Sequence, residues 1–332
     1  MQKDNSIRNG AYIADDGDSE RGSGVQVFDL DTIMAAYDEA AVLAAVERAI
    51  VAFSTGRAQT GASAHLMFDS PPGDCHVRSG SLHGEDVFVV KVASSFYDNP
   101  AQGLSSSQGF VAVLNARTGE PLAILQDRGH LTNIRTAMAG LLAARAIGYA
   151  GRGTIGIVGT GIQARMQAEL IRRHLGAQRL LIWGRDTEKA RQLADELGGE
   201  ASALEALVRQ ADLIVTTTPS TVPLIDDAWI RPSTRIVAVG ADGGGKRELD
   251  PAILHRATVV VDSVDQCLAN GETGWAVNAG FLSPAALIEL GSLLASPRAF
   301  GREDVVVADL TGLGVQDAAI AGAVWRSLAL SV

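Results

Sequence analysis

Two cationic residues stand at positions where packing alone would not require them. Lys91 lies inside the apolar run 86–92, so its side chain either points to solvent from an edge strand or enters a functional site. Arg135 lies near the start of a predicted helix, with Thr132 as a candidate cap, and a cation there opposes the helix dipole. Its side chain therefore either binds a substrate carboxylate or a cofactor phosphate, or is solvated.

Two segments that follow predicted strands contain further candidate site residues. Asp242 follows the apolar segment 236–239 and precedes three glycines. Ligands of open α/β sheets bind beyond the carboxyl ends of the strands, so this carboxylate is expected at the crevice. It could accept a proton from an amine or stabilise an iminium there; the alternative is an Asx turn. The glycines of 309–317 would let a ring approach the backbone, or would form a plain strand-to-helix turn.

A glycine-rich turn predicts a dinucleotide site. Gly159, Gly161 and Ala164 have GxGxxA spacing between the apolar strand 154–158 and an amphipathic helix. Gly159 allows a tight turn, Gly161 allows a pyrophosphate to approach the backbone, and Ala164 lets the helix pack close to the strand. The helix N-terminus offers N–H groups to the phosphates.

The end of the next predicted strand bears on the choice between NAD and NADP. An acidic residue at this place would bind the ribose 2′-hydroxyl of NAD. This chain has Gly184 there, followed by Arg185 and Asp186. An arginine can pair with a 2′-phosphate, so the sequence favours NADP. Asp186 leaves NAD as the alternative, and Arg185 could also be a solvated loop residue.

Composition and spacing argue against several other classes of protein. A formal net charge of −10 does not suit nucleic-acid or anionic-membrane partners, and no apolar run reaches the roughly 20 residues needed to span a bilayer. Cys75 and Cys267 are far apart, so we expect no disulfide and a cytoplasmic location. The histidines show no metal-ligand spacing, so no metal is expected; they are His65, His76, His83, His130, His174 and His255.

The pattern of elements predicts an α/β fold. After residue 152, apolar strands alternate with helices, as in a doubly wound parallel sheet. The predicted strands are 154–158, 180–183, 213–216, 236–239, 259–262 and 305–308. Before that lie a helix at 38–53, strands at 63–68, 74–78, 86–92, 109–114 and 121–125, a polar loop at 94–107 and a helix at 132–147. A C-terminal helix at 316–330 is expected to return to this first part.

The chain resembles the ornithine cyclodeaminase/mu-crystallin family over about residues 35–330. The matching residues are Lys91, Asn99, Gly103-Leu104, Thr118-Gly119, Pro121-Leu122-Ala123, Leu131-Thr132, Arg135-Thr136-Ala137, the segment 159–164, the segment 240–250, Asp309-Leu310-Thr311-Gly312 and Gln316-Asp317. The resemblance implies a Rossmann-type sheet beside an α+β substrate and dimerisation domain, in a homodimer. The predicted division is a flexible tail at 1–24, a substrate domain at 25–138 and 310–332, and a Rossmann domain at 139–309.

The resemblance also implies roles for the candidate residues. Lys91 and Arg135 would hold the carboxylate of a small amino or imino acid, with Thr311 beside them, and Lys91 and Asp242 would be catalytic. The implied cofactor contacts are Ser106, Arg135, Thr136, Gly159, Gly161, Ile162, Gln163, Ala164, Arg185, Thr218, Val239 and Lys246. The implied chemistry is NAD(P)-linked hydride transfer at the Cα of an amino acid or its imine.

Two departures from the family pattern bear on the substrate. Many members carry an arginine before the lysine that also grips the carboxylate. Arg57 does not map onto that position, for which Ser63 and His65 are candidates. Ornithine-specific members have an acidic residue on the preceding strand, whereas the corresponding slot here falls near Arg78. An arginine would repel a second ammonium and suit a second carboxylate, unless it is a solvated strand residue.

Three functions are therefore compatible with the sequence. The leading hypothesis is an imine reductase or amino-acid dehydrogenase acting on a small 2-imino or 2-amino acid. The second is an ornithine cyclodeaminase, which would use its cofactor catalytically and release ammonia. The third is a protein like mu-crystallin that binds NADP(H) and a small ligand without turnover.

Overall fold

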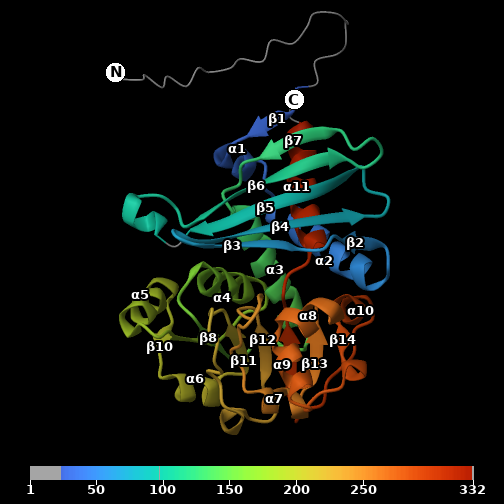
Figure 1. Ribbon diagram of the computed structural model, residues 1–332. Helices are drawn as coiled ribbons and strands as arrows, with labels where there is room; N and C mark the ends of the chain where they lie inside the picture. The colour runs from blue at the N-terminus through green and yellow to red at the C-terminus, as the bar shows by residue number, and fades with distance from the viewer. Residues whose placement is uncertain (1–23, 97, 331–332) are drawn as a thin grey trace, which may run out of the picture.

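The computed structural model describes residues 24–96 and 98–330. It contains two sheets with helices between and around them (Figure 1). The predicted tail, apart from its last residue, lies outside the described residues. None of the helices in this part of the chain is long and apolar enough to cross a membrane.

The first sheet has the order β1-β7-β6-β5-β4-β2, with β3 paired to β4. Its strands are β1 (Gln26–Phe28), β2 (Ala58–Thr60), β3 (Ala64–Asp69), β4 (Pro72–Leu82), β5 (Val87–Phe96), β6 (Ser107–Asn115) and β7 (Pro121–Leu125). The strand expected at 86–92 is longer than predicted, since its polar end at 93–96 still pairs with β4 and, in part, with β6. The loop expected from 94 therefore begins after Phe96 and holds the short 3-10 helix η1 (Asn99–Gln102).

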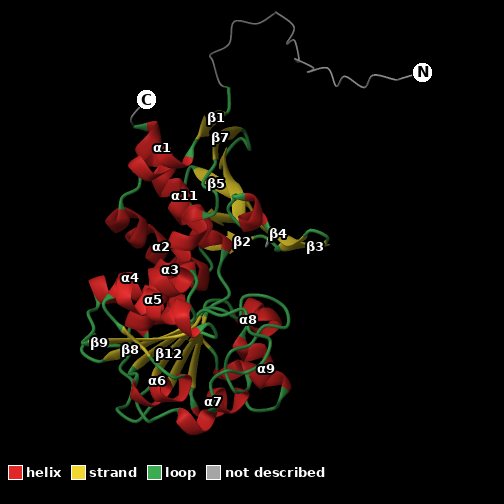
Figure 2. Cartoon of the chain, turned by 90° about the vertical axis from the view of Figure 1, so that its left-hand side faces the viewer, coloured by secondary structure: helices red, strands yellow, loops and turns green. Residues whose placement is uncertain are grey.

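The second sheet is entirely parallel and has the order β10-β9-β8-β11-β12-β15-β13-β14. Its strands are β8 (Thr154–Val158), β9 (Arg179–Trp183), β10 (Glu200–Ala201), β11 (Leu213–Thr216), β12 (Arg235–Ala238), β13 (Thr258–Val261), β14 (Ile288–Glu289) and β15 (Val306–Asp309). Buried Ile, Val and Leu side chains fill its strands, because helices cover both faces (Figure 2). The prediction of a Rossmann-type doubly wound sheet is confirmed.

The helices form two groups. One group packs with the first sheet, and the other connects the strands of the second sheet. The first group comprises α1 (Leu30–Ala35), α2 (Glu39–Ser54), α3 (His130–Ala146) and α11 (Gly314–Ala329). The second group comprises α4 (Ile162–His174), α5 (Thr187–Leu197), α6 (Leu204–Gln210), α7 (Pro251–Arg256), α8 (Val264–Asn270), α9 (Glu272–Asn278) and α10 (Leu290–Ala295), with 3-10 turns η2 (Asp227–Trp229) and η3 (Pro284–Ala286). As expected, α11 returns to the first sheet, where it packs against α2, β4 and β5.

Helix α3 joins the two halves and begins earlier than predicted. Gly129, with a φ of 81°, is its N-cap, and the Asp127 carboxylate accepts a hydrogen bond of 3.0 Å from the Leu131 N–H. The expected cap Thr132 lies inside the helix instead, and its hydroxyl has no partner among the described residues. The helix packs against both α11 and α4, so the predicted domain boundary at 138/139 falls within it.

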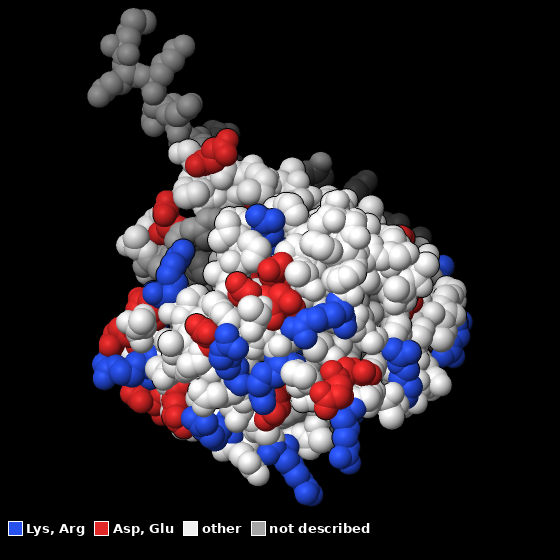
Figure 3. All heavy atoms as spheres, turned by 90° about the horizontal axis from the view of Figure 1, so that it is seen from below, with Lys and Arg blue, Asp and Glu red and all other residues white. Residues whose placement is uncertain are grey.

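The underside of the second sheet carries charges of both signs. Basic and acidic side chains are interspersed over the described residues on this face (Figure 3). Ion pairs also link side chains of α6, α7 and η2, where Arg209 lies 2.8 Å from Glu205 and Arg256 lies 2.7 Å from Asp227. Such pairing gives this face no single-sign field to attract a polyanion.

Candidate active site

A buried ion cluster lies where α11 meets β5 and α3. Lys91 Nζ is 2.9 Å from Asp317 Oδ2, and Arg135 Nε donates to Asp317 Oδ1 at 3.0 Å. Arg135 Nη1 also donates to Gln316 Oε1 at 3.1 Å. Lys91 is 3% exposed, Arg135 6% and Asp317 2%, so neither cation is a solvated surface residue. The anionic partner that Arg135 requires is thus supplied within the chain.

Burial and mutual pairing set the charges in this cluster. Burial lowers the pKa of Lys91 to about 8. The negative charge of Asp317 raises this pKa in part, and the positive charge of Arg135 lowers it further. Burial alone would raise the pKa of Asp317, but Lys91 and Arg135 hold it below its usual value. Two cations and one carboxylate therefore leave a net positive charge, which suits an incoming anion.

Arg78 adds a third cation from β4, where it lies opposite Lys91. Its Nη1 donates to the carbonyl oxygens of Gly312 at 2.9 Å and Thr311 at 3.3 Å. Burial and then Arg135 lower its pKa. A Cβ at Gly312, whose φ is +82°, would lie 2.6 Å from Arg135 Nη1 and 3.0 Å from Arg78 Nη1, so both guanidinium groups converge on this glycine. Arg78 is therefore half-buried and hydrogen-bonded to the loop at 311–312 rather than free in solvent.

Asp262, which the sequence did not single out, holds the backbone around Thr311. Its carboxylate accepts from the Gly312 N–H at 2.6 Å, the Thr311 N–H at 3.1 Å and the Thr311 hydroxyl at 3.1 Å. Cys267 Sγ donates to the same carboxylate at 3.3 Å, and burial raises the pKa of this thiol well above its usual value. Cys267 is therefore a neutral packing residue, in keeping with the expected absence of a disulfide.

The glycine-rich turn has the geometry that a dinucleotide requires. Gly159 has a φ of +135°, and a Cβ there would lie 2.3 Å from Thr217 Oγ1. Gly161 caps α4 and faces open space, with no atom within 4 Å of a Cβ placed on it. Ala164 is fully buried behind the turn. A phosphate can therefore approach the N-terminus of α4 without meeting a side chain of Gly161.

Asp242 lies where two pockets meet. One pocket, beside the ion cluster, is lined by Arg135, Thr136, Asp242, Thr311 and Gln316, among others. The other, beside the glycine-rich turn, is lined by Gln163, Thr218, Gly240, Asp242 and Lys246, among others. Val239 belongs to both. Asp242 Oδ1 also accepts from Lys246 Nζ at 2.8 Å, so its carboxylate is held at the junction as an ion pair.

Two buried side chains of these pockets lack a partner for one polar atom among the described residues. They are Gln316, through Nε2, and Gln163, through Oε1. Gln316 already accepts from Arg135, and Gln163 Nε2 donates to the Asn133 carbonyl at 3.1 Å. Unpaired buried polar atoms are costly, so these two atoms are candidates for contact with a bound ligand.

Two buried glutamates hold the loops on the nucleotide side. Glu248 accepts from the Thr218 N–H at 2.6 Å, the Thr218 hydroxyl at 2.7 Å and the Gly240 N–H at 3.0 Å. Burial raises its pKa to about 7. Glu272 accepts from the Glu248 N–H at 2.5 Å, and burial, followed by repulsion from Asp309, raises its pKa to about 9. Thr218 is thus fixed by a side chain that the sequence pattern did not indicate.

Other predicted residues lie apart from the two pockets. Arg185 and Ile162 are exposed, and Asp186 caps α5 by accepting from the Glu188 and Lys189 N–H groups. Ser106 lies next to β6, and its carbonyl accepts from the Phe96 N–H. Within the described residues, Lys91 and Arg78 are also absent from the lining of both pockets. Arg78 contacts Thr311, which lines the first pocket, and Lys91 shares Asp317 with Arg135, which also lines it.

The parallel sheet and the glycine-rich turn define the class of dinucleotide-binding α/β proteins. The family model described as the ornithine cyclodeaminase/mu-crystallin family matches residues 27–330. The chain belongs to this family.

Relatives and solved structures agree with that assignment. An uncharacterized cyclodeaminase of Sinorhizobium fredii is 38% identical over 270 residues, which cover 77% of this chain and 81% of that protein. An archaeal alanine dehydrogenase dimer with bound NAD has a TM-score of 0.84 and 29% identity, covering 93% of this chain and 97% of that chain. The iminosuccinate reductase of Paracoccus denitrificans in complex with NAD+ has a TM-score of 0.84 and 26% identity, covering 92% and 97%.

Proposed function

We propose that this chain is an NAD(P)-dependent imine reductase or amino-acid dehydrogenase that transfers hydride at the Cα of a small 2-imino or 2-amino acid. The observation that carries this proposal is the position of Asp242 between two pockets, one beside buried Lys91 and Arg135 and half-buried Arg78, and one beside a dinucleotide turn. The similar alanine dehydrogenase and iminosuccinate reductase chains bind NAD, and both act on a carbon between a carboxylate and a nitrogen.

The second pocket and the glycine-rich turn beside it fit a nicotinamide dinucleotide. Gly161 leaves room at the helix N-terminus, and Gln163 has an unpaired buried oxygen beside it. We assign Gly159, Gly161, Gln163 and Thr218 to cofactor binding, and with them Ser106, Arg135, Thr136, Ile162, Ala164, Arg185, Val239 and Lys246. When bound, the reduced cofactor supplies hydride to the imine carbon.

The chain's own residues orient the substrate and move a proton. Arg135, with Arg78 and Lys91 behind it, attracts the carboxylate, and Thr311 and Gln316 line the same pocket. Since Asp317 fixes the Arg135 guanidinium from one side, its remaining N–H groups are oriented before substrate arrives. Asp242 then exchanges a proton with the substrate nitrogen, and Lys246 holds its carboxylate in place.

A reductase assay with an ammonia assay beside it tests this function. With 2-oxo acids plus ammonia or methylamine, the nicotinamide absorbance should fall as the cofactor is consumed. A cyclodeaminase, which the Sinorhizobium fredii relative's name makes the second candidate, would instead release ammonia from a diamino acid with no net change in this absorbance. Tight cofactor binding with no turnover on the whole panel would favour a binding protein of the mu-crystallin type and overturn the proposal.

Arg185 is proposed to favour NADP over NAD. Its side chain is exposed at the end of β9, and Asp186, the acidic alternative, is engaged in capping α5. Arg185→Ala should raise the KM for NADPH roughly tenfold, the lower end of the range for a charge-assisted hydrogen bond because the side chain is exposed, and leave the KM for NADH nearly unchanged. Lys189→Ala, an exposed cation on the next helix, is the control. Equal losses with both cofactors would contradict the assignment.

Arg78 is proposed to favour an acidic substrate. Arg78→Met should lower kcat/KM for a dicarboxylic imino acid about 10- to 100-fold, because a charge-assisted hydrogen bond contributes roughly 1.5–3 kcal/mol. A substrate with an apolar side chain should lose less. Arg57→Met removes an exposed arginine and should change neither value. If both substrates lose equally, Arg78 acts on the common carboxylate rather than on a second one.

A homodimer is the proposed assembly. The face of the first sheet that points away from α11 carries exposed Leu66 (59%), Phe68 (40%) and Phe110 (37%), a surface that a second copy could cover. The similar archaeal alanine dehydrogenase is a dimer. Light scattering would give the mass in solution. The cytoplasmic location stays a prediction.

A further inference from the structure

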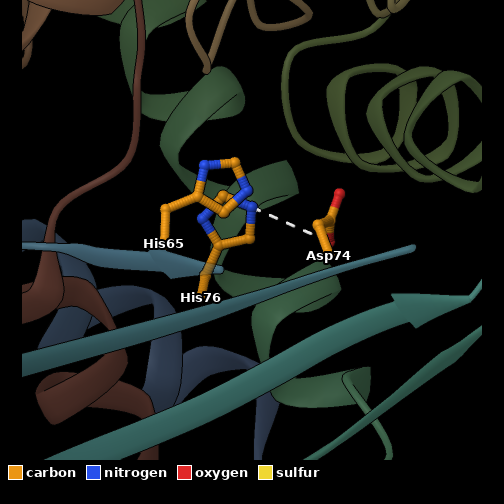
Figure 4. A group of neighbouring side chains, drawn as sticks. All are labelled: His65, Asp74 and His76. Atoms are coloured by element: carbon orange, nitrogen blue, oxygen red, sulfur yellow. Dashed lines mark ion pairs between the residues drawn. The ribbon is translucent and has the colours of Figure 1, made fainter. Parts of the chain in front are cut away.

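A cluster of two histidines and one aspartate lies on the β3–β4 hairpin, outside the site described above. His65 of β3 is directly opposite His76 of β4, and Asp74 lies two residues before His76. Alternate residues of a strand point to the same face, so Asp74 and His76 share a face, and His65 joins them across the pair. Figure 4 shows all three side chains on the same side of the strands.

The three side chains already lie close together. The imidazole rings of His65 and His76 stack with centroids 3.9 Å apart and an interplanar angle of 17°. His76 Nε2 is 3.8 Å from Asp74 Oδ1. One ligand atom from each residue can be chosen so that all three lie within 4.8 Å of one another. Sequence spacing did not indicate this cluster, because the register of the hairpin creates it.

These donors match a particular kind of ion. Two imidazoles and one carboxylate suit Zn²⁺ and related divalent transition metals, rather than Ca²⁺ or Mg²⁺, which prefer oxygen. Bonds of roughly 2.0 Å would place the ligand atoms about 3.3 Å apart around a tetrahedral ion. The two rings would have to turn out of their stack, about their broad χ2 torsions, to bring the ligand atoms this close.

We propose that His65, Asp74 and His76 form a binding site for a divalent transition metal such as Zn²⁺. The hairpin gives the ion a structural task. Every residue of β3 is exposed, and β3 pairs with β4 alone among the described strands. A metal bonded to both strands would add a side-chain link to the backbone ladder that joins β3 to β4. Three protein ligands also leave a fourth coordination position for water or a small ligand.

The position of the site relates it to the active-site cleft. Arg78 lies two residues after His76 on β4, therefore on the same face, and it contacts Thr311 and Gly312 beside the first pocket. The metal would thus bind on the face of the hairpin that continues towards the ion cluster. Binding does not depend on the proposed reaction, so the two proposals can fail separately.

Cobalt titration of the full chain tests the site. Protein without a histidine tag, stripped of metal with a chelator, should bind one Co²⁺ per chain with the visible absorption of tetrahedral cobalt, and Zn²⁺ should displace it. Zn²⁺ should also raise the Tm. The variants His65→Ala and His76→Ala should each lose the absorption and the Tm shift, whereas His83→Ala, which removes an exposed histidine elsewhere, should keep both.

Other outcomes overturn the proposal. If wild type gives no cobalt absorption, or if the double variant His65→Ala/His76→Ala keeps it, the cluster is a stacked ring pair and not a metal site. If His83→Ala loses it equally, the ion binds exposed histidines in general. Circular dichroism and the metal-free Tm show whether each variant is folded, so loss of binding can be separated from loss of structure.

Discussion

Asp317→Asn is expected to destabilise the chain by about 3–5 kcal/mol, because it leaves buried Lys91 and Arg135 without the carboxylate that pairs with both of them. The change keeps the size of the side chain, so packing is nearly preserved. Urea denaturation measures the free energy of unfolding. Activity should fall as well, since Arg135 loses the contact that orients its guanidinium towards the first pocket.

A double variant separates pairing from general damage. Asp317→Asn leaves both Lys91 and Arg135 unpaired, and the added change Lys91→Met removes one of these two cations. The double variant should therefore lose less unfolding free energy than the two single variants lose together. A coupling energy of about 1–3 kcal/mol would fit residues in direct contact. Additive losses would mean that Asp317 acts through packing rather than charge. Asp31→Asn, at an exposed position, serves as the control.

The pH dependence of the same cluster follows from Lys91. Its pKa of about 8 in the folded chain is below the ordinary value of 10.5. The unfolded chain binds the Lys91 proton more tightly than the folded chain does, so protonation of Lys91 opposes folding, and this cost is complete below pH 8. The free energy of unfolding should therefore rise as the pH rises from 8 towards 10.5. Substrate binding should change in the opposite sense, with KM for the acid rising above pH 8 as Lys91 loses its charge.

The strand pattern predicted the parallel sheet well, but not the ion cluster. Each longer strand of that sheet has a mainly apolar run that is visible locally, whereas β10 and β14 are two-residue strands that exist through pairing alone. The Lys91–Asp317 pair depends on α11 returning to β5 after the chain has formed all the strands of the second sheet. Sequence reasoning placed Lys91 and Arg135 in a site but could not supply their shared carboxylate.

The same reason explains the other residues that were missed. Asp262 and Glu248 act on backbone N–H groups of distant loops, and such contacts leave no local spacing in the sequence. His65 and His76 lie eleven positions apart, and the register that sets them face to face depends on where the hairpin turns. Roles that follow from one strand or one turn were predictable; roles shared between elements were not.

Asp242→Asn is expected to lower kcat by roughly 10²–10⁴-fold, the range for loss of a general acid–base group, with little change in cofactor affinity. An amide keeps the size of the side chain and can still contact Lys246, but it cannot exchange a proton with the substrate nitrogen. Steady-state kinetics gives kcat, and fluorescence titration with the reduced cofactor gives its Kd. Because Asp242 lies between the two pockets, this pair of measurements separates chemistry from binding.

The outcome also distinguishes Asp242 from the cations behind the first pocket. Loss of Arg135 or Lys91 should raise KM for the acid, since these residues attract its carboxylate, whereas loss of Asp242 should act on kcat. Asp195→Asn, an exposed carboxylate on α5, should leave both constants unchanged. Normal turnover in Asp242→Asn would remove its catalytic role. The proton would then have to come from another group, for which Lys91 is the candidate, since a pKa of about 8 keeps it mostly protonated near neutral pH.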